Sequence, residues 1–192
     1  YKDSKGKSAI FTSYAMNYGK NGDTRGGKLM GAYNGWGFQT VGECAQGHNS
    51  AITTDDGRAF LVCHTKFNDG TAGHQVRAHQ LFTNSDGWLV ASPFRYNGEM
   101  VTDADIASAQ PFTAAELAGT YKLLIHKYGM DYANYEEVTP IEITLSEDGK
   151  ITGGKTGTWT ITEGTGYISL VLGGIKYNGV VTEEVMDGKT VH

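Results

Sequence analysis

Four histidines in the first half of the chain are the side chains best suited to bind a metal or move a proton near neutral pH. They are His48, His64, His74 and His79. Their spacing matches neither a helical zinc motif nor a zinc finger, so a zinc centre is not indicated. His64 and His79 lie in predicted strands with apolar neighbours, which predicts hydrogen-bonded structural histidines. His74 follows a glycine-rich turn and is predicted to lie in a loop.

His48 differs from the other three because a glycine precedes it and two polar residues follow it. We expect Gly47 to let the backbone turn tightly, so that His48, Asn49 and Ser50 place three polar side chains at the start of a strand. If this strand is the inner strand of a propeller blade, its first residues face the central channel, where such proteins keep their sites. The alternative is a structural histidine that is hydrogen-bonded to a carboxylate.

The acidic residues include no pair of carboxylates that is predicted to act together. The glutamate pairs at 136–137 and 183–184 are predicted to lie on solvated faces, and Glu43 in a surface loop. Five aspartates fall in predicted turns, where the side chain bonds the local backbone: Asp55, Asp56, Asp69, Asp86 and Asp148. Acid–base catalysis by these residues alone is therefore not indicated.

Composition and charge exclude several classes of partner. The 192 residues include 16 Lys or Arg and 21 Asp or Glu, which gives a net charge of −5. Nucleic acids and anionic membranes attract clustered positive charge, so neither is an expected partner, and no apolar run is long enough for a membrane span. Glycine occurs 27 times and proline three times, which favours tight turns over a disordered linker.

The two cysteines and the chain ends carry less information. Cys44 and Cys63 cannot form a common zinc pattern. Cys63 is predicted to be a buried free thiol, with a disulfide to Cys44 as the alternative. The sequence begins at Tyr1 without a methionine or a signal peptide, and it ends shortly after a turn at 187–188. We therefore expect both ends to continue in a longer protein.

The first half of the chain predicts a four-stranded antiparallel meander. Its β-rich runs are joined by tight turns, of which Asp55-Asp56-Gly57 carries a hairpin signature. Such meanders form the blades of β-propellers and also parts of β-sandwiches, so the pattern alone leaves both architectures open. The four runs are residues 49–54, 58–66, 75–83 and 88–96.

The pattern changes after about residue 100. Residues 103–110 are small and polar, and they are predicted to be a linker. Thr113 and Glu116 fit a capping box and Gly119 is placed to end the helix, so one short helix is predicted. A second meander of five strands is typical of a small closed or nearly closed barrel. These strands are predicted at 119–126, 139–145, 150–161, 166–172 and 175–184.

Several of these segments resemble family 43 glycoside hydrolases. The motifs occur in the order of the family's last blade, and they are nearest to endo-1,5-α-L-arabinanases that have an additional C-terminal domain. Residues from Gly119 onward resemble that β-barrel domain. The motifs are Gly47-His-Asn-Ser50, Phe60-Leu-Val-Cys-His-Thr-Lys-Phe-Asn68, His74-Gln-Val-Arg-Ala-His-Gln-Leu-Phe82, and Asp86-Gly-Trp88 followed by residues 91–96.

The resemblance implies an all-β fold in two parts. Residues 1–105 would form the last part of a five-bladed β-propeller, the end of blade 4 and blade 5, and residues 112–192 a small β-barrel-like C-terminal domain. It also implies hydrolysis of α-1,5-linked arabinan with inversion. The catalytic carboxylates would come from earlier blades, so none is expected here. This chain alone is expected to be inactive without a complementary N-terminal propeller fragment.

The resemblance also implies ligand-binding roles near the propeller axis. His48 would contact a calcium ion whose other ligands are mostly water, and Asn49 and Ser50 would bind substrate. Calcium prefers oxygen ligands, so the residues alone do not indicate it. Cys63 and Lys66 stand where the family suggests a bulkier residue and an arginine. The implied location is secreted, periplasmic or cell-surface, in a bacterium.

Two other classes of function remain open on the sequence. A non-catalytic carbohydrate-binding module would use Tyr33, Trp36 and Trp88 as stacking platforms for sugar rings. A lipocalin-like binder would use the barrel-like second half. Depolymerisation of arabinan in the presence of the complementary fragment would separate the hydrolase from both alternatives.

Overall fold

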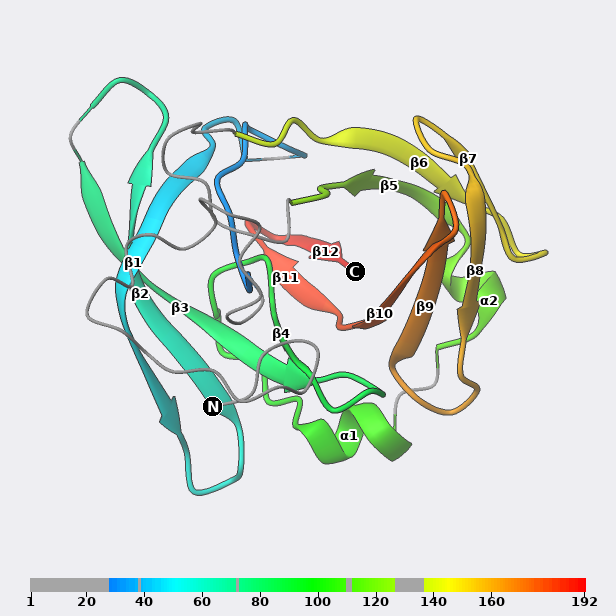
Figure 1. Cartoon of the computed structure of the whole chain (residues 1–192). Helices are drawn as coiled ribbons and strands as arrows, with labels where there is room; N and C mark the ends of the chain where they lie inside the picture. The colour runs from blue at the N-terminus through cyan, green and yellow to red at the C-terminus, as the bar shows by residue number, and fades with distance from the viewer. Residues whose placement is uncertain (1–27, 38, 72, 110–111, 127–136) are drawn as a thin grey trace, which may run out of the picture.

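The computed structural model describes residues 28–37, 39–71, 73–109, 112–126 and 137–192. Within these ranges the chain is almost entirely β-structure (Figure 1): a four-stranded sheet, a curled six-stranded sheet and a two-stranded hairpin. The predicted all-β fold, a blade-like meander followed by a barrel-like sheet, is confirmed. None of the helices in the described ranges has the length and apolar character needed to cross a membrane.

The four-stranded sheet is the predicted antiparallel meander. Its first strand begins at Glu43 rather than at residue 49, and its last strand ends at Ala91 rather than at residue 96. Pro93 follows closely and has no N–H to donate to a ladder, which explains the early end. The strands are β1 (Glu43–Thr53), β2 (Ala59–Phe67), β3 (His74–Thr83) and β4 (Leu89–Ala91), paired in that order.

The six-stranded sheet curls around its own core and opens toward the four-stranded sheet (Figure 1). One predicted strand is divided into two. The run at 150–161 breaks at Gly153, where the backbone has φ of +100° and a Cβ would lie 2.8 Å from the Glu142 carbonyl oxygen. The strands are β5 (Gly119–Leu123), β6 (Ile141–Leu145), β7 (Lys150–Gly153), β8 (Gly157–Ile161), β9 (Tyr167–Leu172) and β10 (Ile175–Val180); β11 (Glu184–Met186) and β12 (Lys189–Val191) form the hairpin.

Alternating side chains of the six-stranded sheet form its core. On β8, Trp159 points inward and is 2% exposed, and its Nε1–H donates to the carbonyl oxygen of Ser146. The predicted short helix, α2 (Ala114–Leu117), packs Leu117 onto this core, and both bonds of the Thr113–Glu116 capping box are present. The core therefore joins the sheet and the helix that precedes it.

The segment predicted as a linker is a second helix, α1 (Asp103–Ser108). Thr102 and Asp105 form a capping box that starts it, with aspartate where glutamate is usual. Ile106 is fully buried, and its carbonyl oxygen accepts a hydrogen bond from the backbone N–H of Gly166 at 2.8 Å. The linker prediction was wrong because the other five residues of α1 are small or polar, and the single buried isoleucine does not stand out among them.

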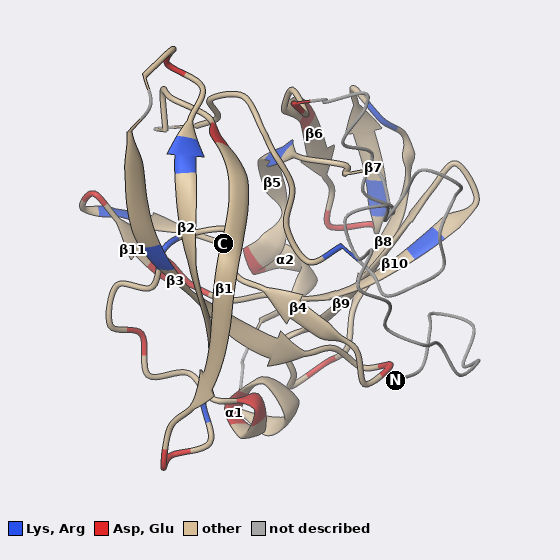
Figure 2. Cartoon of the chain, turned by 60° about the vertical axis from the view of Figure 1, so that its left-hand side comes forward, with Lys and Arg blue, Asp and Glu red and all other residues tan. Residues whose placement is uncertain are grey.

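Several acidic residues lie at hairpin ends and on α1, as the red segments of the ribbon in Figure 2 show. The turn prediction is confirmed for all five aspartates. In Thr54–Arg58, for example, Asp56 accepts hydrogen bonds from Thr54 Oγ1 at 2.5 Å and from the Arg58 backbone at 3.2 Å. The confirmed residues are Asp55, Asp56, Asp69, Asp86 and Asp148.

Candidate functional site

Strand β1 presents the three predicted site residues to solvent. His48, Asn49 and Ser50 are all exposed, at a point where the ladder to β2 is irregular between Cys44 and Gly47 and again between Gly47 and Ser50. Bulges of this kind re-aim side chains and are common beside active sites. His48 itself has φ of +48°, which costs a residue with a Cβ about 1–2 kcal/mol.

Gly47 does not have the role that the sequence suggested. The left-handed backbone falls at Ala45 (φ +51°) and His48, and Gly47 is not among the residues with positive φ. A Cβ at Gly47 would meet the Ala45 carbonyl oxygen at 3.9 Å and His64 Nε2 at 4.0 Å, which are ordinary contacts. The prediction that Gly47 makes the tight turn is therefore wrong, and two bulges make it instead.

Three histidines form a row across adjacent strands. The ring centroids of His48 and His64 are 6.2 Å apart, and those of His64 and His74 are 5.4 Å apart. His74 is the first residue of β3 and pairs with Lys66, so its predicted loop position is wrong. Within the described residues, no group of three or more His, Cys, Asp or Glu side chains is placed to hold a metal ion.

Glu43, the first residue of β1, forms a buried ion pair with Arg77 on β3. Glu43 is 3% exposed, and its Oε1 accepts a hydrogen bond from Arg77 Nε at 3.1 Å. The Arg77 guanidinium also donates to Gln75 Oε1 and lies 5.5 Å from the centre of the Phe67 ring. The surface-loop prediction for Glu43 is therefore wrong. Arg77 reaches Glu43 from two strands away, which sequence spacing does not reveal.

His79 and Cys63 are buried on the same sheet. His79 is 1% exposed, its Nδ1 lies 3.0 Å from the Ser92 carbonyl oxygen, and burial lowers the pKa of the imidazole. A neutral ring then donates from Nδ1, as predicted for a structural histidine. Both cysteines are free; Cys63 is 3% exposed, and burial raises the pKa of its thiol. The predicted buried free thiol is confirmed.

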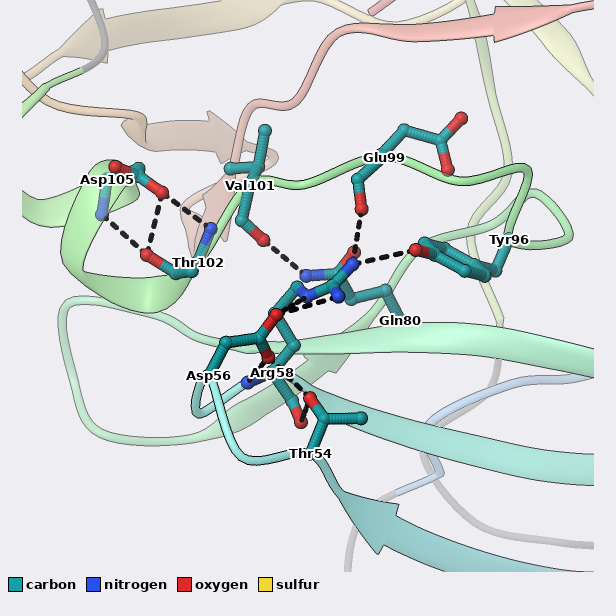
Figure 3. Close-up of polar contacts among 9 residues, drawn as sticks. All are labelled: Thr54, Asp56, Arg58, Gln80, Tyr96, Glu99, Val101, Thr102 and Asp105. Carbon is teal, nitrogen blue, oxygen red and sulfur yellow. Dashed lines mark hydrogen bonds and ion pairs between the residues drawn. The ribbon is translucent and has the colours of Figure 1, made fainter.

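Arg58 ties the β1–β2 turn to the segment that leads into α1 (Figure 3). Its Nη1 donates to Tyr96 Oη and to the Glu99 carbonyl oxygen, both at 2.7 Å, and its Nε donates to Asp56 at 2.9 Å. These bonds from Arg58 hold the pKa of the Asp56 carboxyl well below its usual range. The hydrogen bonds of Arg58 and Asp56 hold these two loop segments together, so we assign this cluster a structural role and not a catalytic one.

Glu184 connects the C-terminal hairpin to the four-stranded sheet. It is 6% exposed, and its Oε1 accepts a hydrogen bond from Ser92 Oγ at 2.6 Å. Burial raises the pKa of this carboxyl, and the nearby charge of Glu99 adds to the effect. The prediction that Glu183 and Glu184 both lie on a solvated face is wrong for Glu184.

The aromatic residues proposed as sugar platforms do not form one surface. Tyr33 is 5% exposed, whereas Trp88 is 51% exposed in the turn before β4. Trp36 is half-buried and stacks parallel to Phe94, with ring centroids 5.1 Å apart. A continuous three-ring platform is therefore absent, which weakens the carbohydrate-binding-module alternative.

Comparison with known families identifies the larger group to which these sheets belong. A family model, described as the C-terminal lipocalin-like domain of family 43 glycoside hydrolases, matches residues 93–191, just over half of the chain. The chain belongs to glycoside hydrolase family 43. The resemblance found in the sequence motifs is thereby confirmed.

Family 43 relatives extend the likeness to the four-stranded sheet. The extracellular endo-α-(1→5)-L-arabinanase 2 of Bacillus subtilis is 40% identical over 161 residues, 81% of this chain and 31% of that protein. The extracellular endo-α-(1→5)-L-arabinanase of Thermotoga petrophila is 32% identical over 172 residues, 83% of this chain and 33% of that protein. The family 43 protein YxiA from Bacillus licheniformis superposes with a TM-score of 0.71 at 32% identity, covering 84% of this chain and 34% of its own. The chain thus spans about a third of the length of these relatives.

Proposed function

We propose that this chain is the C-terminal part of a secreted endo-1,5-α-L-arabinanase that hydrolyses α-1,5-linked arabinan with inversion. The observation that carries the proposal is the 40% identity with an extracellular arabinanase over 81% of the chain. In this proposal the four-stranded sheet is the last blade of the propeller, and its first strand, β1, faces the central channel. The curled six-stranded sheet is the accessory domain.

The catalytic carboxylates would come from the part of the protein that precedes these residues. Inversion needs a general acid and a general base on opposite sides of the scissile bond, about 6.5–9.5 Å apart. The buried carboxylates described above have structural partners: Glu43 bonds Arg77, and Glu184 bonds Ser92. Capping boxes use Asp105 and Glu116. Because these four carboxylates serve structural contacts, we expect this part of the protein to position the substrate or the other blades rather than to supply the catalytic acid and base.

His48, Asn49 and Ser50 fit a water-rich calcium site better than a closed one. Calcium takes six to eight oxygen ligands, and β1 offers one imidazole with two exposed oxygen-bearing side chains beside it. We propose that His48 contacts the ion or its water shell and that Asn49 and Ser50 bind arabinan nearby. A bound calcium ion would supply positive charge beside the substrate.

Hydrolysis of linear arabinan tests the proposed activity. The complete protein should release reducing sugar, and proton NMR should show the β-anomer of the new reducing end first, because inversion reverses the α-linkage. The 192-residue chain alone should release none. Failure of the complete protein to degrade linear arabinan would refute the proposal.

Replacement of His48 tests the proposed metal site. In the complete protein, His48→Ala should lower both bound calcium per molecule and arabinan hydrolysis. His74→Ala, in the same histidine row but at the start of β3, is the matched control and should change neither. Unchanged calcium content in His48→Ala would show that the histidine is structural.

A further inference from the structure

A groove of about 390 Å³ lies between β5, at the edge of the curled sheet, and β12 of the C-terminal hairpin, and residues just before β1 and just after β4 complete its walls. We name it the Trp36 groove. None of the residues that line it comes from β1, so it is separate from the His48 region. Its walls include Trp36, Phe94, Thr120, Lys122, Thr190 and His192. This volume falls in the range of ordinary small-ligand sites, roughly 300–1,000 Å³.

The indole ring of Trp36 is held in place by three contacts. Phe94 stacks parallel to it at an interplanar angle of 3°, and the ring of Tyr33 meets it edge-on at 5.9 Å. The indole Nε1–H donates to Gln39 Oε1 at 2.8 Å. A ring fixed in this way loses little freedom when a ligand packs against it, so it is pre-organised for binding.

The charged side chains of the groove are already paired. Lys122 Nζ donates to Glu142 on β6 at 2.9 Å, and the Glu116 carboxylate closes the capping box of α2. The remaining polar side chains are Thr120, Thr190, His192 and Tyr121, whose hydroxyl donates to the Leu117 carbonyl oxygen at 2.8 Å. β5 and β12 are also edge strands in the described sheets, so each has backbone groups outside a ladder. The groove thus favours a neutral ligand with many hydroxyls over an anion or a cation.

We propose that the Trp36 groove is an accessory binding site for a neutral oligosaccharide, with one sugar ring packed on Trp36 and hydroxyls bonded to the rim. The identity of the sugar as an arabino-oligosaccharide rests on the proposed function. The site would hold a second stretch of the polymer on the accessory domain while another stretch occupies the channel. Linking two sites raises the apparent affinity for a long chain without any new contact at either one.

Calorimetric titration of the 192-residue chain with linear α-1,5-arabinohexaose tests the proposal. Trp36→Leu should weaken binding about tenfold or more, as expected for removal of an aromatic anchor. Trp88→Leu is the matched control, because Trp88 is 51% exposed in a different turn, and it should bind like the parent. The double variant Asn49→Ala/Ser50→Ala should retain the Trp36-dependent binding.

Folding of each variant is checked by circular dichroism. Parent-like affinity in a folded Trp36→Leu variant would overturn the proposal. If that variant does not fold, Thr120→Val/Thr190→Val decides: a several-fold loss supports the groove, and parent-like binding refutes it. A Trp36-dependent preference for xylohexaose or cellohexaose would overturn the arabino-oligosaccharide as the ligand of the groove, whereas arabinan hydrolysis by the complete protein tests the proposed function separately. Absence of Trp36-dependent binding to all three sugars, with arabinan hydrolysis intact in the complete protein, would refute the groove alone.

Discussion

Glu43 and Arg77 place opposite charges beneath β1, with side chains only 4% and 10% exposed. Removing one partner of such a pair leaves the other charge buried and unpaired. Arg77→Met should therefore lower the free energy of unfolding by about 3–5 kcal/mol, measured by urea denaturation. The double variant Glu43→Gln/Arg77→Met should recover most of that loss. Equal losses in the single and double variants would mean that the contact of the Arg77 guanidinium with the Phe67 ring, rather than its pairing with Glu43, dominates.

Single residues were the hardest level to predict. The buried free thiol of Cys63 follows from local pattern and was predicted, whereas His48, predicted at the start of a strand, lies within β1. Glu43 and Glu184 look like ordinary surface acids in the sequence, because their partners lie 34 and 92 residues away. At the two bulges the residues with positive φ are Ala45 and His48, not the glycine or proline that usually signals unusual backbone in a sequence.

The two short helices show which local sequence patterns were sufficient to predict a secondary-structure element. Thr113 and Glu116 were recognisable as a capping box, whereas Thr102 and Asp105 were not, although both boxes are fully formed. The hairpins were found from their Asp-Gly turns, which fix local geometry. The division of β7 from β8 was missed because it depends on the close approach of Gly153 to Glu142 on the neighbouring strand.

Helix α1 should depend on its cap. Thr102 Oγ1 accepts from the Asp105 backbone N–H at 3.2 Å, and Thr102→Ala removes this bond. We expect a loss of about 1 kcal/mol in the free energy of unfolding, measured by urea denaturation. Thr102→Ser keeps a hydroxyl at the same place and is the control. Equal losses in the alanine and serine variants would point to the methyl group instead of the cap.

At the level of the whole molecule, Glu184 makes the contact between the hairpin and the four-stranded sheet sensitive to pH. Its pKa is raised above the ordinary 4.5, so the folded protein holds this proton more tightly than the unfolded chain. The contribution to stability is complete below pH 4.5 and is lost as pH rises through the raised pKa. Glutamine imitates the protonated form at every pH.

Glu184→Gln should therefore have a higher melting temperature than the parent at pH 8, and the difference should disappear toward pH 4. The matched control is Glu183→Gln, because Glu183 is the exposed neighbour in the chain. It should leave the pH dependence unchanged. A melting-temperature difference between Glu184→Gln and the parent that is independent of pH would exclude titration of Glu184 as the cause.

Because Cys63 is buried, the rate at which its thiol is alkylated can report how often the four-stranded sheet opens. Residues 112–192 contain no cysteine, and Cys44 can be replaced by serine, so Cys63 would then be the single alkylation site. A thiol that is 3% exposed reacts only when the surrounding strands separate. With Trp36 and Trp88 replaced by phenylalanine, the fluorescence of Trp159 reports the opening of the six-stranded sheet independently, because Trp159 lies in the core of that sheet. In mild denaturant, equal rates from the two probes would mean that both sheets open as one unit, and faster labelling of Cys63 would mean that the four-stranded sheet opens first.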